Sequence, residues 1–365
     1  MNKINVKNIK VIRNYRTWLL EAKGLNEKSV VKMERAIHLY QDFTEDEDFN
    51  RFNSDRAINF KNFLKQKKYR GKVMAPNSYR TYLIHLRGFF TWLCTQPGYK
   101  SRIKIDSLEY LTVSKKESRL AVQKTIKNFP MLEYIKDIAN SVVTTTEIGL
   151  RNRALISFTF LTGMRDGAII SLPIMSINED ELYVLQNPMY GVKTKFGKTI
   201  YSKIFKFDPD LLLCFLHWLK HLKKKGFSNN DPLFPRSKVK KEGNNLSFQE
   251  ATEVEPVYWE STASMRKIFK DQCELIKKEY HSPHKYRDAA IYYALKSARN
   301  GEEIKAVSQN FGHENVATTM TVYAQLTPEH QLDVLSQLNF QDEDTISEER
   351  LLELLRKILK GKNRI

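Results

Sequence analysis

Apolar residues recur every three or four positions through most of the first hundred residues, which is the spacing of one helical face. Four such stretches are separated by polar or glycine-containing breaks. The clearest, residues 78–94, places six apolar residues on one side: Tyr82, Leu83, Leu86, Phe89, Phe90 and Leu93. We therefore expect four helices and no strand in this region, with a basic loop at residues 66–73.

The periodicity is lost between residues 95 and 119, where charged residues accumulate, and this predicts a domain boundary. Helical patterns return at residues 130–139 and 149–161, and the second is apolar on nearly every side. Further helices are expected at 211–225 and 262–279, with an exposed loop at 226–258 between them.

Residues 181–207 change to a period of two, which predicts a small antiparallel sheet with Phe196-Gly197 at its turn. The pattern places Tyr201, Phe205 and Phe207 on one strand face, opposite Ile200 and Ile204. The expected fold is mainly α with this small antiparallel β-sheet, in two domains. A last amphipathic stretch, residues 345–365, is expected to be a helix that packs either on its own domain or on a neighbouring subunit.

The chain has 365 residues, of which 41% are hydrophobic and 28% charged, enough apolar content for two folded domains. No run of 18 apolar residues and no secretory signal are found in the sequence. The three cysteines, Cys94, Cys214 and Cys273, have neither metal-binding nor disulfide spacing. These features together predict a protein of a reducing cytosol.

The net charge is +18, and residues 1–100 hold 20 Lys and Arg against 9 Asp and Glu. Such a chain is expected to bind a polyanion, most often nucleic acid. For any single basic residue, a solvated surface charge is the alternative interpretation. The candidate DNA contacts are Lys67, Lys68, Arg70, Arg80, Arg87, Lys193 and Lys198.

Six residues form a set that could cut a phosphodiester: Arg165, Lys195, His284, Arg287, His313 and Tyr323. Arginines bind the phosphate oxygens on which charge develops in the transition state. Histidines donate hydrogen bonds or carry a proton, and a lysine can protonate the leaving 5′ oxygen. A tyrosine hydroxyl, whose reference pKa is about 10, needs nearby positive charge to act as the nucleophile. We expect no metal and no other cofactor, because no cluster of Asp and Glu accompanies the set.

The order of these residues resembles the tyrosine recombinase (phage integrase) family. The matching motifs are Thr162-Gly163-Met164-Arg165, a hairpin Lys195, and His284-Lys-Tyr-Arg287, followed by Gly312-His313-Glu-Asn-Val-Ala-Thr318-Thr319 and Tyr323. The resemblance covers residues 10–330. It is the five motifs in order, and not any one of them, that is specific.

The resemblance implies a two-domain, C-shaped DNA clamp. Residues 1–110 would be a helical core-binding domain, 111–120 a linker and 121–340 the catalytic domain. Residues 341–365 would be a C-terminal helical tail, for which packing on its own domain and exchange between subunits are both open. Tyr323 would attack the scissile phosphate to form a 3′-phosphotyrosyl link, without metal or ATP. The implied partner is double-stranded DNA, bound by a homo-tetramer on two sites in the bacterial cytosol or nucleoid.

The sequence departs from the family pattern at Ala168, where the family commonly has a glutamate three residues after the first arginine. Asp166 is a candidate replacement. The hairpin lysine is also open, because Lys193 and Lys198 flank Lys195.

The leading hypothesis is a site-specific recombinase that acts as integrase or transposase of a mobile element. The alternatives are a type IB topoisomerase, which uses the same chemistry without strand exchange, and a catalytically silent DNA-binding regulator on the same scaffold.

Overall fold

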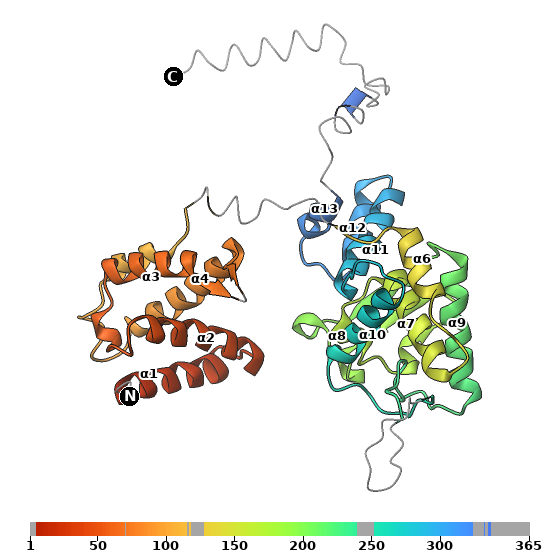
Figure 1. Ribbon diagram of the computed structural model, residues 1–365, viewed down its shortest axis with the longest axis horizontal. Coiled ribbons are helices and arrows are strands. Elements are labelled where there is room, and N and C mark those ends of the chain that lie inside the picture. Colours follow the sequence, from red (N-terminus) through yellow and green to blue (C-terminus); the bar gives the residue numbers. More distant parts are fainter. Residues whose placement is uncertain are drawn as a thin grey trace, which may run out of the picture. The chain divides into compact units, whose positions relative to one another are not determined.

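The computed structural model describes residues 5–69, 71–114, 117, 128–238 and 252–323, together with residues 332, 335 and 336. The chain divides into two compact units, Met1–Thr125 and Ile126–Ile365 (Figure 1). The predicted domain limits stay a prediction, because part of the proposed linker lies outside the described residues. The tail at 341–365 lies wholly outside them.

The first unit contains the four expected helices. They are α1 (Val6–Thr17), α2 (Glu27–Phe43), α3 (Ser54–Gln66) and α4 (Pro76–Leu93). A π-helical turn η1 (Trp18–Ala22) extends α1, and 3-10 turns η2 (Phe49–Arg51) and η3 (Ile105–Leu111) join the bundle. Asn5, Asn26 and Asn53 begin α1, α2 and α3, and each side chain accepts a backbone N–H of the first turn. These caps satisfy donors that would otherwise lack a partner, which explains where the helices begin.

The core of the first unit is largely aromatic. The Tyr40 ring lies edge-on to Phe60 and Phe90, at 5.1 Å and 5.4 Å between centroids, and Phe52 stacks on Phe90 at 3.9 Å. Leu108 and Leu111 of η3 are buried against the same core. Residues up to 111 therefore belong to the packing of this unit.

The loop expected at residues 66–73 is a small hairpin, so the prediction of no strand here was wrong. Strands β1 (Lys68–Tyr69) and β2 (Lys72–Val73) pair antiparallel, with Lys68 opposite Val73. Gly71, with φ 77°, supplies the turn conformation that other residues rarely adopt. Both strands are exposed, which is why no buried alternation marks them in the sequence.

The second unit is built around α7 (Glu147–Thr162), which contacts α6 (Leu132–Asn140), α9 (Pro209–Lys224) and α11 (Pro283–Ser297). Every residue of α7 from Ala154 to Thr162 is buried, which confirms the helix predicted to be apolar on nearly all sides. The other helices are α8 (Asp166–Ile169), α10 (Thr262–Leu275), α12 (Gly301–Asn310) and α13 (Val316–Tyr323). Figure 1 shows α11, α12 and α13 grouped at one end of this unit, where they contact one another.

The predicted sheet is present, with shorter strands than expected. Strands β3 (Ile177–Asn178), β4 (Tyr183–Gln186) and β5 (Ile200–Lys203) are antiparallel in the order β3-β4-β5. Phe205 and Phe207 are not in β5, because the Phe205 N–H donates to the Leu161 carbonyl of α7. Their rings stack on each other at 4.8 Å and pack against the helical core. Three 3-10 turns flank the strands: η4 (Ile174–Ser176), η5 (Pro188–Tyr190) and η6 (Lys195–Gly197).

The loop expected to be exposed at 226–258 is in part a core element. Leu233, Phe234 and Val254 are buried, and the Trp218 indole donates to the Leu233 carbonyl at 2.9 Å. The prediction failed because these apolar residues are few and are surrounded by long polar stretches, so no periodic pattern marks them. Residues 239–251 lie outside the described part.

Within the described ranges, no helix is long and apolar enough to cross a membrane. The same ranges contain no group of three or more His, Cys, Asp or Glu residues placed to hold a metal ion.

Candidate active site

The C-terminus of α7 ends at Gly163, whose φ of 55° is left-handed and favours glycine. A Cβ at this position would lie 2.4 Å from Cε1 of Phe311 and 2.9 Å from Cβ of Ala290. Glycine therefore both ends the helix and lets α11 and the chain after α12 approach it. Arg165 follows two residues later and caps the short helix α8.

Arg287 of α11 joins three of the predicted motifs. Its side chain is buried, with 3% of the residue exposed. Nη1 donates to the Gly163 carbonyl at 2.6 Å, and Nη2 donates to the Phe311 carbonyl and lies 2.9 Å from Nε2 of His313. One guanidinium thus connects the end of α7 with the segment that carries His313.

His313 is held from both sides of its ring. Because a guanidinium has only donors, Nε2 must accept from Arg287, which leaves the proton on Nδ1. Nδ1 lies 2.8 Å from Oγ1 of Thr319, a buried residue of α13. The preceding Gly312, with φ 61°, leaves room for β5, since a Cβ there would lie 2.5 Å from Cδ1 of Ile200.

The two arginines form a positively charged site. Burial lowers the pKa of Arg287 to about 9, repulsion from Arg165 lowers it further, and the negative charge of Asp288 partly opposes both. Burial likewise lowers the pKa of Arg165. In the described part of the chain, no carboxylate lies within ion-pair distance of either guanidinium, and Asp288 pairs instead with Lys285 at 3.6 Å. Two desolvated cations with no carboxylate within ion-pair distance favour binding of an anion.

The three hairpin lysines differ in their surroundings. Lys198 pairs with Glu314, the residue after His313, at 2.5 Å. The Lys193 N–H donates to Oγ of Ser171 at 2.8 Å, which fixes the base of the loop. Lys195 lies in η6, and its ammonium stands 4.7 Å from the centroid of the Phe196 ring. Among the described residues, Lys198 is the one lysine of the three that forms an ion pair, whereas none is found for the ammonium of Lys193 or of Lys195.

His284 and Tyr323 complete the predicted set. His284 is exposed near the start of α11, one turn before the buried Arg287. Tyr323 is the last residue of α13, one turn after Thr319; its side chain lies outside the described part. Tyr286 is fully buried and the Tyr293 hydroxyl accepts the Leu132 N–H, so neither competes for the role of nucleophile.

Asp166 does not replace the missing glutamate as a partner of Arg165. Its Oδ2 accepts from Nε and Nη2 of Arg266 in α10, so that expectation was wrong. Sequence reasoning missed Arg266, because nothing local to α10 marks it. Thr319 was quoted in a motif but given no role, and its bond to His313 supplies one.

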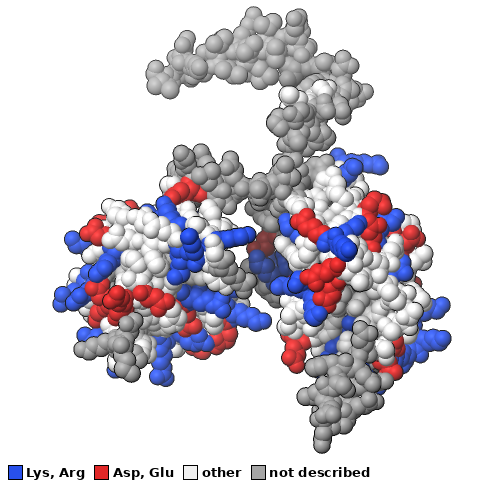
Figure 2. Space-filling model, in the orientation of Figure 1, with Lys and Arg blue, Asp and Glu red and all other residues white. Residues whose placement is uncertain are grey.

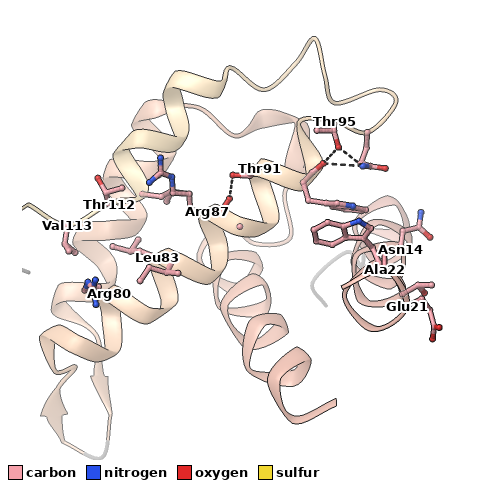
Figure 3. A pocket seen from close by; sticks show the side chains of 17 residues that line it. Asn14, Glu21, Ala22, Arg80, Leu83, Arg87, Thr91, Thr95, Thr112 and Val113 are labelled. Carbon is pink, nitrogen blue, oxygen red and sulfur yellow. Dashed lines mark hydrogen bonds between the residues drawn. The ribbon is translucent and has the colours of Figure 1, made fainter. Parts of the chain in front are cut away.

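The first unit carries its candidate DNA contacts on an open surface. Arg80 and Arg87 line a hollow of about 1270 Å³ between α4 and η1, which Trp18 and Trp92 also line (Figure 3). Lys67 lies over the Phe63 ring and Lys68 is exposed in β1, whereas Arg70 lies outside the described residues. Figure 2 shows basic side chains on the visible face of each unit, interspersed with acidic ones.

A second basic hollow escaped the sequence reasoning. It measures about 250 Å³, lies between α2 and α4, and is lined by Lys32, Arg35 and His85. Burial, and then repulsion from Lys32, lowers the pKa of His85. The three residues are dispersed in the sequence, so only packing reveals the cluster.

Comparison with known proteins decides the family. The profile of the phage integrase family matches residues 131–330, more than half of the chain. The chain belongs to the phage integrase family. This confirms the resemblance and the expected enzyme class, a tyrosine-type site-specific recombinase.

Two relatives of this phage integrase family member align with it over nearly their whole length. A "Probable integrase/recombinase" of Aquifex aeolicus is 25% identical, covering 87% of this chain and 97% of that protein. The tyrosine recombinase XerD of Listeria monocytogenes is 22% identical, covering 90% and 98%. Among solved structures, a lambda integrase(75–356) dimer bound to a COC′ core site aligns with a TM-score of 0.59 and 14% identity, covering 86% and 94%. The last likeness is one of fold.

Proposed function

We propose that this recombinase cuts and rejoins double-stranded DNA through a 3′-phosphotyrosyl intermediate, as integrase or transposase of a mobile element. The observation that carries the proposal is the pair of desolvated arginines, the half-buried Arg165 and the buried Arg287, with no carboxylate of the described residues within ion-pair distance of either. A phosphodiester is the anion that such a pair can hold through its non-bridging oxygens.

Each step balances without an external energy source. The Tyr323 oxygen forms a bond to phosphorus as the bond from phosphorus to the 5′ oxygen breaks. The tyrosine proton passes to a base, for which His284 is the candidate, and Lys195 supplies a proton to the leaving oxygen. A 5′-hydroxyl of a partner strand then reverses these changes, so the number of phosphodiester bonds is conserved.

The arginines supply most of the electrostatic stabilisation. Negative charge on the phosphate oxygens grows as the phosphorane forms, and fixed donors lower that barrier without having to reorganise. His313 adds to this by keeping Arg287 in place. The two units would close on DNA as a clamp, and the recombining complex would be a homo-tetramer on two sites, with residues 341–365 linking subunits.

Covalent trapping tests the proposal. The target sequence is not known, so the probes are nicked duplexes tiling the DNA that flanks the gene. A nick beside the scissile phosphate lets the short fragment diffuse away and leaves the adduct in place. We expect a covalent protein–DNA adduct with the wild-type chain and none with Tyr323→Phe, while both bind the duplex.

The rival functions give different products. Relaxation of supercoiled DNA by a monomer, with no joined products, would indicate a type IB topoisomerase. Sequence-specific binding with no adduct would indicate the silent regulator. An adduct that persists in Tyr323→Phe would refute the assigned nucleophile.

A further inference from the structure

An arginine–aspartate contact lies directly beside the candidate site. Arg266 of α10 places Nε 2.9 Å and Nη2 2.5 Å from Oδ2 of Asp166. Asp166 is the first residue of α8, and its Oδ1 accepts the Gly167 N–H at 2.9 Å. The Asp166 carboxylate therefore links the first turn of α8 to α10, through a residue 100 positions further along the chain.

Few other contacts hold Arg165 in position. Its carbonyl accepts the N–H groups of Ala168 and Ile169, at 2.9 Å and 3.0 Å, so its backbone caps α8. No carboxylate among the described residues lies within ion-pair distance of its guanidinium, and burial lowers its pKa. Ala168, which stands where an acid is common in the family, is 1% exposed and apolar. The direction of the Arg165 side chain thus depends on where the first turn of α8 is held.

We propose that Asp166 and Arg266 are positioning residues for Arg165, and that their contact takes over the support that an acid at position 168 would give. The inference rests on the proposed function. Neither residue contacts the phosphate in this scheme, since the guanidinium of Arg266 is directed to Asp166. Their effect reaches the reaction through the backbone between Asp166 and Arg165.

The exposure of the pair separates this role from simple stabilisation. The side chains of Arg266 and Asp166 are 55% and 24% exposed. Ion pairs this exposed add little to stability. A misplacement of about 1 Å at a reacting group, by contrast, can cost up to roughly 100-fold in rate. The cleavage rate is therefore the sensitive readout, and the melting temperature is not.

A double-mutant cycle on the full chain tests the proposal. The probe is the nicked flanking-DNA duplex, and the adduct rate is measured in single turnover at saturating DNA. We expect Asp166→Ala and Arg266→Ala each to lower this rate about 10-fold, and the double variant to lose about 10-fold as well, because both remove one contact. Arg266→Lys, which keeps the charge, should recover part of the rate. The Kd for DNA should change less than about 2-fold, and Tm by no more than about 4 °C.

The pair formed by Arg236 and Glu255 provides a matched control. It is an Arg–carboxylate contact in the same unit, at 2.5 Å, with side chains 46% and 25% exposed. Arg236→Ala and Glu255→Ala should leave the saturated rate unchanged. A weaker Kd for Arg266→Ala with a wild-type saturated rate would make Arg266 a direct DNA contact and overturn the proposal. Additive losses, about 100-fold in the double variant, would overturn it too. If the wild-type chain forms no adduct, the proposed function itself fails.

Discussion

On α4 of the first unit, Arg80 and Arg87 line a hollow open to solvent, whereas Arg287 of the second unit is 3% exposed and held by two carbonyls and a histidine. An exposed arginine can neutralise a backbone phosphate and release counterions, which adds affinity. A desolvated, fixed arginine interacts more strongly with charge that develops on a reacting phosphate. The same residue type is thus suited to binding in one unit and to chemistry in the other.

Burial alone does not define the site, as Arg151 of α7 demonstrates. Arg151 is also 3% exposed, and its guanidinium donates to the Pro235 carbonyl, to Ser237 and to Asn152. Burial lowers the pKa of Arg151 to about 10, whereas that of Arg287 falls to about 9 with repulsion from Arg165 added to burial. The second arginine is the feature that makes the Arg287 environment an anion site.

The largest effect that separates the two kinds of arginine is expected from Arg287→Ala. It should lower the adduct rate at saturating DNA by about 100-fold or more, because a transition-state donor is lost. A loss below about 10-fold, equivalent to about 1.4 kcal/mol, would count against that role.

Arg287→Ala also leaves the carbonyls of Gly163 and Phe311 without this donor, so stability needs a control. Arg151→Ala is the control, since it removes an equally buried arginine and leaves the Pro235 carbonyl without this donor. Both variants should lower Tm, while only Arg287→Ala should lower the rate of the folded protein.

The next largest effect on the cleavage rate is expected from the three hairpin lysines. If Lys195 is the general acid, Lys195→Ala should lower cleavage by about 100-fold, whereas Lys193→Ala and Lys198→Ala should cost less than about 10-fold. A substrate with sulfur in place of the bridging 5′ oxygen should restore the rate of Lys195→Ala, because a thiolate leaves without protonation. If the same sulfur substitution restores Lys198→Ala instead, the acid is Lys198, released from Glu314.

The smallest effect is expected in the first unit. Arg80→Ala and Arg87→Ala should each weaken DNA binding a few-fold and reduce the slope of log K against log salt by about 1. The adduct rate at saturating DNA should be unchanged. A drop in that rate with an unchanged salt slope would mean that these arginines act on the reacting site, and the contrast between the units would fail.

The sequence predicted the local features well. The apolar run of α7, its end at Gly163 and the alternation before β5 follow from spacing and from single residues, so no partner needs to be known. The prediction failed where contacts with residues distant in the sequence determine the local structure. Phe205 lies outside β5 because its N–H donates to a carbonyl of α7, and Leu233 is buried because it packs into the core that contains Trp218.

For the candidate site too, the sequence predicted some features and only the tertiary structure determined others. The ordered motifs gave the residue types and their order, because the reaction needs those groups whatever their positions. Only the tertiary structure brought Arg287 to Gly163, 124 residues away, and Asp166 to Arg266, 100 residues away. Burial, pKa and partner choice depend on such distant contacts, since they arise from everything that surrounds a charge and not from its neighbours along the chain.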